Sequence, residues 1–388
     1  MKTQNQPCKP SYNESWRKFI AIFRLLTVTG MMVTALCFIP ACIQQEKKVK
    51  TVQPAEERSL QEQQASPELK KLLSEQRKFI SDHHLGYTVG VTVASDQSLK
   101  DIHSERILTQ NEVLKFQNQL KAKVISHEAM AVIGSMRLKT CNASSPKYDA
   151  RDDSLVPPVR VQMGSDCWAY SATAAVECSY IRVNRIALPY KIDLSEKQLW
   201  VCTPGDNSTT GGANYALDYL VATSTKMMTE KQFPNDGHYG TCPSIVPASF
   251  AELTDWNLID PSGDLLKTPP VSLIKEAICK YGPVISSVYE TPAFANYTGG
   301  IFSGTPSSSL PRSSNHSLLI VGWDDSKNAW LVRNSYGSTW GEKGYGWIDY
   351  NSNNIGIRAA WVLAKKIYIK HKLTPEEIKA MLKYLQQN

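Results

Sequence analysis

The chain has 388 residues and a formal net charge of +7 at pH 7, from 43 Lys and Arg against 36 Asp and Glu. The basic residues are scattered among acidic ones and form no stripe, so we interpret the charge as solvated surface and exclude a nucleic-acid interface. A hydrophobic content of 42% is ordinary for a globular protein, and the length suits one to three domains. Nine cysteines are an odd number, so at least one thiol stays free or modified.

The N-terminus has the pattern of an export signal. Three basic residues between positions 17 and 24 precede an apolar run at 25–42, and the chain turns polar directly after it. We therefore predict that residues 1–42 are a signal peptide and that the protein is exported, secreted or periplasmic, where disulfides persist. The run ends in IPAC, which resembles a bacterial lipobox, so a lipidated Cys42 could anchor the protein to the cell envelope. Cleavage without lipidation and a retained signal anchor are the alternatives.

Residues 43–145 are predicted as a linker followed by a small mixed α/β segment. The part at 43–66 is rich in Gln, Glu and Lys and poor in apolar residues, which is typical of a linker. Leucines at helical spacing predict a helix from Ser66 to residue 80, and residues 86–95 alternate as a strand does. A capping box of Thr109 with Glu112 begins a second predicted helix, over 108–125.

The stretch VQMGSDCWAY, residues 161–170, contains a candidate nucleophile, Cys167. The sequence from Cys167 to residue 183 has four alanines and no Gly or Pro, which predicts a helix that begins at the cysteine. Free N–H groups at a helix N-terminus stabilise a thiolate. Asp166 is the predicted N-cap, and if it does not cap the helix, its carboxylate would raise the pKa of the thiol.

A candidate general base comes far downstream. His316 opens the apolar strand HSLLIVGW, and Asn334 follows the strand AWLVR. If the two strands are neighbours, the side-chain carbonyl of Asn334 can hold the imidazole of His316 in one tautomer. Taken singly, each would be an ordinary strand-end or turn residue.

From about Tyr148 to Ala364, ordered sequence blocks resemble those of the papain-like cysteine peptidases, as an exported bacterial member with a non-standard propeptide. The blocks are, in chain order, YDARD, VRVQMGSDCWAYSA, LSEKQLWVC, GGANYAL, GPVISSVYETPAFANYTGGIF, NHSLLIVGW and NSYGSTWGEKGYGWI. The resemblance implies an α+β, papain-like fold of two lobes within residues 146–366. A helical lobe would span about 148–255, and a β-barrel-like lobe about 256–366.

The resemblance also implies roles for single residues. Cys167 would be the nucleophile, His316 its thiolate–imidazolium partner, and Asn334 the group that orients His316. Gln162 and the backbone N–H of Cys167 would stabilise the oxyanion.

Three further positions match the family's substrate groove. Gly211 and Gly212 match its Gly-Gly segment, and the backbone of Gly212 would pair with an extended peptide. Trp340 would pack beside the Asn–His pair, and Tyr336 replaces the family's other shielding tryptophan.

The cysteines follow the family in part. The resemblance implies a disulfide between Cys202 and Cys242, and it shows that another family disulfide is absent, with Thr209 at one of its positions. Cys178 and Cys279 lie in predicted helices, where we expect buried free thiols. Cys141 is left unassigned.

The implied activity is hydrolysis of peptide bonds in protein or peptide substrates by a monomeric zymogen that needs no metal or organic cofactor. Residues 43–145 would lie in the cleft and be cut near 141–150, with a retained adaptor domain as the alternative. Only five positions separate Gln162 from Cys167, where the family has six. This difference favours the main alternative function, a non-catalytic papain-fold peptide-binding protein. An acyltransferase with the same Cys-His-Asn set is a third possibility.

The C-terminal tail, 367–388, extends past the family's end. Its sequence LTPEEIKAMLKYLQQ predicts a capped amphipathic helix over 373–387. We expect this helix to dock on the enzyme's own surface, with a partner interface or a substrate exosite as alternatives.

Overall fold

The computed structural model describes residues 54–95, 105–106, 108–121, 123, 140–186, 189–205, 210–244, 250–310 and 313–365. These residues belong to one compact unit, Val52–Asn388. The predicted signal peptide with Cys42 and the predicted tail helix lie outside the described residues.

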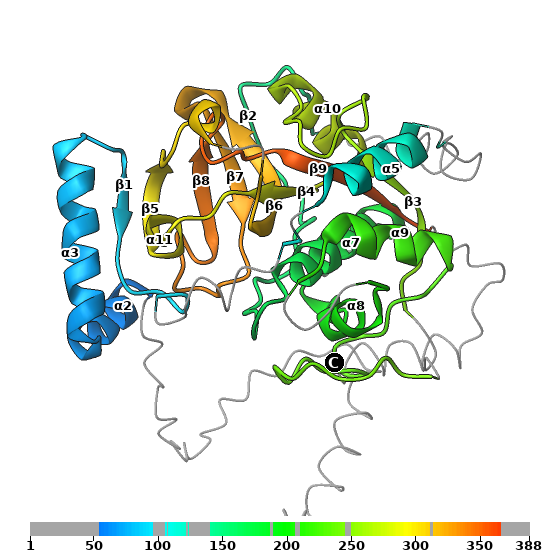
Figure 1. The fold of residues 1–388 in the computed structure, drawn as a ribbon, viewed down its shortest axis with the longest axis horizontal. Coiled ribbons are helices and arrows are strands. Elements are labelled where there is room, and N and C mark those ends of the chain that lie inside the picture. The colour runs from blue at the N-terminus through cyan, green and yellow to red at the C-terminus, as the bar shows by residue number, and fades with distance from the viewer. Residues whose placement is uncertain are drawn as a thin grey trace, which may run out of the picture. The chain divides into compact units, whose positions relative to one another are not determined.

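A large sheet forms one side of the molecule (Figure 1), and its strands run in the order β1-β5-β8-β7-β6-β4-β9-β3, with β2 paired to β6. Among the described strands the path is open, because none of their pairings closes β3 onto β1. The ladders are antiparallel except for the parallel pair of β5 and β8. The strand bounds are β1 Tyr87–Val89, β2 Lys147–Asp149, β3 Leu253–Leu258, β4 Val284–Val288, β5 Tyr297–Phe302, β6 His316–Asp324, β7 Ala329–Arg333, β8 Tyr345–Asp349 and β9 Ile357–Ala364.

Strands β4, β6, β7 and β9 are buried along nearly their whole length, which agrees with their mostly apolar sequences. The predicted strand that starts at His316 is confirmed, and so is the strand before Asn334. The predicted lobe boundaries need a correction. Tyr148 lies in β2 of the sheet, and β3 continues across the predicted border at 255.

The helical side is centred on α7, Cys167–Asn184, which confirms the predicted helix. Every residue of α7 except its last is buried, because the helix packs on β6 and β9 and on two further helices. Small alanine side chains allow these close contacts. Helices α8, Glu196–Cys202, and α9, Ala213–Ala222, pack on α7. The other described elements after α7 are α10 Val271–Tyr281, α11 Pro292–Ala295 and the 3-10 turns Pro189–Lys191, Ser307–Ser309 and Asp325–Lys327.

The upstream segment begins with α2, Pro54–Gln64, and α3, Pro67–Asp82. The prediction of a linker over 43–66 is therefore wrong for its second half. Leu, Glu, Gln and Arg favour a helix there, and Arg58 donates hydrogen bonds to the carbonyls of Thr339 (2.9 Å) and Gly341 (3.1 Å). The Ser66 cap of α3 is confirmed.

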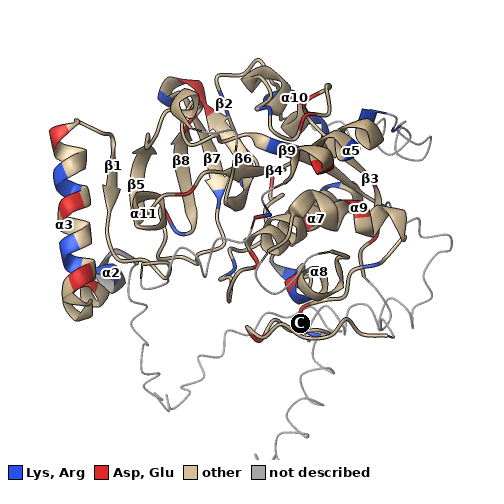
Figure 2. Ribbon diagram, in the orientation of Figure 1, with Lys and Arg blue, Asp and Glu red and all other residues tan. Residues whose placement is uncertain are grey.

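Charged residues of both signs alternate along α3, whereas β1 and β5 beside it have almost none (Figure 2). Strand β1 covers only part of the predicted strand 86–95, and it pairs with β5, so the upstream segment extends the sheet by one strand. This pairing leaves the charged face of α3 exposed to solvent.

The second upstream helix is α5, Gln110–Lys121, and its capping box is confirmed. Phe116 packs against the rings of Tyr215 on α9 and Trp256 on β3. The upstream segment thus contacts the sheet through β1 and the opposite side of the molecule through α5 (Figure 1).

Two disulfides tie the described chain. The predicted bond between Cys202 and Cys242 is confirmed. Cys279 is bonded to Cys141, so the prediction that Cys279 is a free thiol is wrong. Ile274, Ile278 and Tyr281 form the buried stripe of α10, and Cys279 lies beside this stripe, half-buried and within reach of a partner. Cys178 is free and buried, as expected, and burial raises the pKa of its thiol.

Candidate active site

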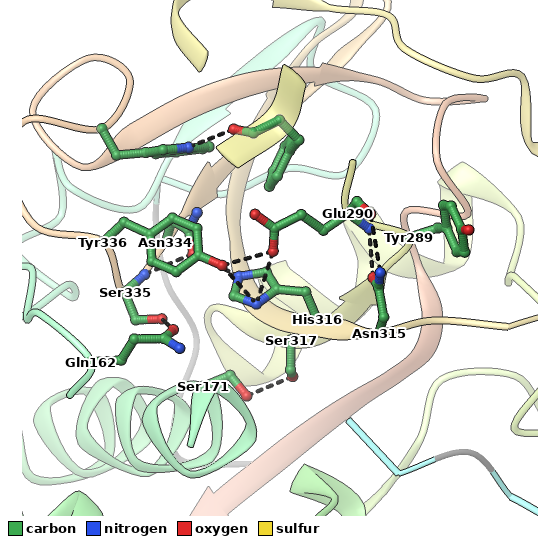
Figure 3. A network of polar contacts seen from close by, with 12 residues as sticks. Gln162, Ser171, Tyr289, Glu290, Asn315, His316, Ser317, Asn334, Ser335 and Tyr336 are labelled. Carbon is green, nitrogen blue, oxygen red and sulfur yellow. Dashed lines mark hydrogen bonds and ion pairs between the residues drawn. The ribbon is translucent and has the colours of Figure 1, made fainter. Parts of the chain in front are cut away.

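His316 and Asn334 lie side by side because β6 and β7 are antiparallel neighbours. The Nε2 atom of His316 is 2.8 Å from Oδ1 of Asn334, and both side chains are buried (Figure 3). An amide oxygen can only accept a hydrogen bond, so Nε2 carries the proton and donates it. This assignment leaves Nδ1 as the imidazole nitrogen for proton transfer.

Cys167 is the first residue of α7, and its thiol is buried and not disulfide-bonded. Ser171, one helical turn later, is 2.6 Å from Ser317, the residue after His316 (Figure 3). This contact holds the first turn of α7 beside the start of β6. The thiol therefore lies at a helix N-terminus, where a thiolate is stabilised.

Asp166 occupies the N-cap position of α7 but makes no capping hydrogen bond, so its predicted capping role is wrong. Its carboxylate accepts a hydrogen bond of 2.9 Å from the side chain of Asn235 instead. Burial raises the pKa of Asp166 to about 6, and the hydrogen bond from Asn235 opposes the shift. A carboxyl group that titrates near neutral pH thus lies next to the candidate nucleophile.

Glu290 is a member of this cluster that the motifs did not reveal. Its buried carboxylate accepts a hydrogen bond of 2.7 Å from the hydroxyl of Tyr336, and Oε2 is 3.4 Å from Nδ1 of His316 (Figure 3). Asn315 holds the backbone of Glu290 through hydrogen bonds of 2.6 and 3.0 Å. The available signal was an ionisable residue two positions after the end of the buried strand β4, but the register that places it against His316 cannot be read from the sequence.

Tyr336 stacks on His316 with ring centroids 5.1 Å apart. Burial, with the charges of Glu290 and Cys167, holds the pKa of the phenol well above its usual value, so it stays a hydrogen-bond donor. The ring centroid of Trp340 is 6.4 Å from that of Tyr336, and the indole N–H of Trp340 donates a hydrogen bond to the carbonyl of Phe294. The ring beside His316 is therefore that of Tyr336.

Gln162 is tied to the loop after β7. Its backbone N–H donates to the carbonyl of Ser335, and the hydroxyl of Ser335 donates to Oε1 of Gln162, both at 2.7 Å. Nε2 of Gln162 donates to the carbonyl of Gly164 at 2.8 Å. The side chain thus lies near Asn334, with one amide hydrogen used inside its own short loop.

The two candidate groove glycines differ in their surroundings. A Cβ atom on Gly211 would overlap the indole of Trp168, which follows Cys167, so only glycine fits there. Gly212 is the N-cap residue of α9, and its carbonyl accepts the first hydrogen bond of that helix, from Ala216. The edge of this segment that pairs with another stretch of chain is at Gly211, which forms an isolated bridge with Glu105.

A short upstream stretch lies against this edge. The backbone N–H of Arg106 donates to the carbonyl of Gly211 at 2.7 Å. The backbone N–H of Glu105 donates to the carbonyl of Asn315, directly before His316, at 3.4 Å. Residues 105–106 thus cross between the helical side and the sheet beside the candidate base.

Within the described ranges, no three His, Cys, Asp or Glu side chains are grouped as metal ligands would be. No helix in the same part of the chain has the length and apolar character needed to cross a membrane.

Comparison with known proteins agrees with this arrangement. The family model for papain family cysteine proteases matches residues 144–364. Zingipain-2 of Zingiber officinale is 32% identical over 215 residues, 53% of this chain and 88% of that protein. Cathepsin O of Mus musculus is 31% identical over 225 residues, 56% of this chain and 67% of that protein. The chain belongs to the papain family of cysteine proteases.

Solved structures show that the fold likeness includes the upstream segment. The digestive procathepsin L2 proteinase from Tenebrio molitor larval midgut superposes with a TM-score of 0.60 and 21% identity, covering 90% of this chain and 99% of that one. A recombinant stem bromelain precursor superposes with a TM-score of 0.55 and 18% identity, covering 90% and 98%. The predicted α+β papain-like fold is confirmed.

Proposed function

We propose that the protein is an exported zymogen that hydrolyses peptide bonds with Cys167 as nucleophile. The observation that supports this most directly is the 2.8 Å contact between His316 and Asn334, together with the Ser171–Ser317 contact that holds the start of α7 beside them. This is the arrangement that a thiolate–imidazolium pair requires.

The reaction uses these groups in sequence. The thiolate of Cys167 attacks the scissile carbonyl, and Nδ1 of His316 gives its proton to the leaving amine. Water then gives a proton to His316 and attacks the thioester, which releases the acid and restores the thiolate–imidazolium pair. Asn334 keeps the imidazole in place through both steps.

The oxyanion role of Gln162 stays a prediction, because its amide donates to Gly164 in this structure. A Gln162→Ala variant tests it. We expect kcat to fall by about a hundredfold with little change in KM, as for the loss of one oxyanion donor. An unchanged kcat would assign the role to other donors.

In the zymogen, the upstream segment covers the groove. It docks on the sheet through β1 and on the other side through α5, and residues 105–106 lie in between against Gly211 and Asn315. We place the activating cut near residues 141–150, which leaves a catalytic domain of about 146–366 followed by the tail.

Export is supported by the sequence pattern of residues 1–42 and by the two disulfides, since such bonds persist mainly in oxidising compartments. Whether Cys42 carries a lipid is tested by mass spectrometry of the N-terminal peptide.

The function is tested with a thiol-alkylating epoxide on residues 43–388, before limited proteolysis and after proteolysis with reduction of the Cys141–Cys279 disulfide, with the adduct mapped by mass spectrometry. Labelling of Cys167 only after proteolysis supports the zymogen, and immediate labelling makes the upstream segment an adaptor. No labelling of reduced Cys167 in either state favours the peptide-binding alternative. Cys178, buried in the same helix, is the internal control and is expected to stay unlabelled.

Hydrolysis and acyl transfer use the same residues, so they are separated by their products. With a peptide substrate and an added amine, hydrolysis yields the free acid. A dominant amide product would assign the protein to the acyltransferase class.

A further inference from the structure

The side chain of Glu105 is fully buried near the candidate base, and the side chains around it are called the Glu105 pocket below. The hydroxyl of Ser287, on β4, donates a hydrogen bond to Oε1 of Glu105. The Nη1 atom of Arg358, on β9, is 3.2 Å from the same oxygen. Arg358 also donates from Nη2 to the carbonyl of Arg106 at 3.0 Å. The guanidinium of Arg358 thus contacts both the side chain of Glu105 and the backbone carbonyl of the next residue, Arg106.

Burial makes this ion pair energetically important. The side chain of Glu105 is fully buried and that of Arg358 is 4% exposed. Glu105 is the acidic group that pairs with Arg358 among the described residues. Nε of Arg358 and Oε2 of Glu105 are also buried and have no hydrogen-bond partner in that part of the chain. The pocket therefore holds a further donor for a second carboxylate oxygen.

The pocket lies close to the reacting atoms. The backbone of Glu105 donates to Asn315, the residue before His316, and Arg106 donates to Gly211, which packs on the indole next to Cys167. An extended chain rises about 3.3 Å per residue. A substrate residue whose backbone takes the place of Glu105 is therefore within a few residues of the scissile bond.

Release of the upstream segment removes the carboxylate that pairs with Arg358. A buried or half-buried guanidinium without an acceptor is costly, whereas a new carboxylate restores the pair. An apolar side chain in the same pocket would leave the charge of Arg358 unpaired. A basic side chain there would be repelled by that charge.

We propose that Ser287 and Arg358 form a specificity pocket, so that the enzyme prefers peptides with Glu close to the scissile bond. Glu105 occupies this pocket in the zymogen as a stand-in for the substrate side chain. The proposal rests on the peptidase function proposed above and names its substrate class.

The test uses the full chain after limited proteolysis with reduction of the Cys141–Cys279 disulfide, with active sites counted by the Cys167-directed epoxide. Fluorogenic peptides carry one Glu, moved through the positions on both sides of the scissile bond, and matched peptides carry Gln, Leu or Lys there. At one position we expect kcat/KM for Glu to exceed that for Gln or Leu by about tenfold or more, and Lys to be the poorest. Equal rates for Glu, Gln and Leu at every position overturn the proposal while leaving the peptidase function intact.

Variants assign the preference to the pocket. Arg358→Met keeps the length of the side chain and removes its charge, and we expect it to lower the ratio of Glu to Leu cleavage toward one. Ser287→Ala should lower the same ratio by a smaller factor. Arg182→Met removes another buried guanidinium, one that donates to Cys279 away from the groove, and should keep the ratio.

The outcomes separate the two proposals. A merely structural Arg358 would lower cleavage of both peptides equally, and the unchanged ratio would overturn the specificity role. Absence of epoxide labelling together with absence of cleavage would overturn the peptidase function and, with it, the pocket proposal.

Discussion

The carboxylate of Glu290 faces Nδ1 of His316, the imidazole nitrogen that we propose for proton transfer. It is 3.4 Å from Nδ1 of His316 and is held by Tyr336. We expect Glu290→Gln to lower kcat about tenfold, because it removes the buried charge that faces Nδ1 of His316.

Tyr336→Phe is the matched control for this prediction. It keeps the ring that stacks on His316 and removes the hydroxyl that donates to Glu290. Its kcat should fall less than that of Glu290→Gln. Equal kcat values for wild type and Glu290→Gln would mean that Glu290 serves packing alone.

Asp166 sets a pH dependence. Its carboxyl is protonated below a pKa of about 6 and negatively charged above it, next to Cys167, the proposed nucleophile. The negative charge disfavours the thiolate of Cys167. Asp166→Asn should therefore move half-maximal epoxide labelling of Cys167 to lower pH. Asn235→Ala, which removes the hydrogen bond to the carboxylate, should not move it in that direction.

At the scale of elements, helix α7 contains a buried carboxyl group, that of Glu177. Burial raises the pKa of Glu177 to about 7, although Arg160 and Arg333 oppose the shift. The pKa of Glu177 is higher in the folded state than in the unfolded chain, so its protonated form favours the fold. This contribution to the free energy of unfolding is fully present below pH 4.5 and is lost as the pH rises through 7.

Glu177→Gln removes this dependence while keeping an acceptor for the N–H of Leu194. Relative to wild type, the free energy of unfolding of the variant should gain about 3 kcal/mol between pH 5 and pH 8. Thermal unfolding of the Cys167-blocked protein at both pH values measures the difference. Parallel curves for variant and wild type would contradict it.

The elements that sequence predicts best are those with local signals. The caps of α3 and α5 depend on residues three positions apart, and both were found as expected. The His316–Asn334 pair was also predictable, because its motifs mark the ends of two strong strands. Glu290 and Cys279 were not, because their partners come from pairings between distant segments, which leave no local pattern.

At the scale of the whole molecule, the upstream segment acts as a clamp with two anchors. Phe116 on α5 packs between Tyr215 and Trp256 and makes one anchor apolar. We expect Phe116→Ala to weaken this anchor and to raise the rate of Cys167 labelling in the uncut protein by at least about tenfold, since loss of a buried Phe costs about 3 kcal/mol or more. Leu114→Ala, an exposed position on the same helix, is the control and should leave the rate unchanged.

The bond between Cys141 and Cys279 separates cleavage from release. A cut after Cys141 leaves the upstream segment joined to α10 as the second chain of a two-chain protein. A tethered inhibitor is present at an effective concentration on the order of millimolar, so it rebinds the groove long after the peptide bond is broken. Full release then requires a second cut upstream of Cys141 or reduction of the disulfide. The redox potential of the surroundings thereby becomes a second switch on the activity of the cut enzyme.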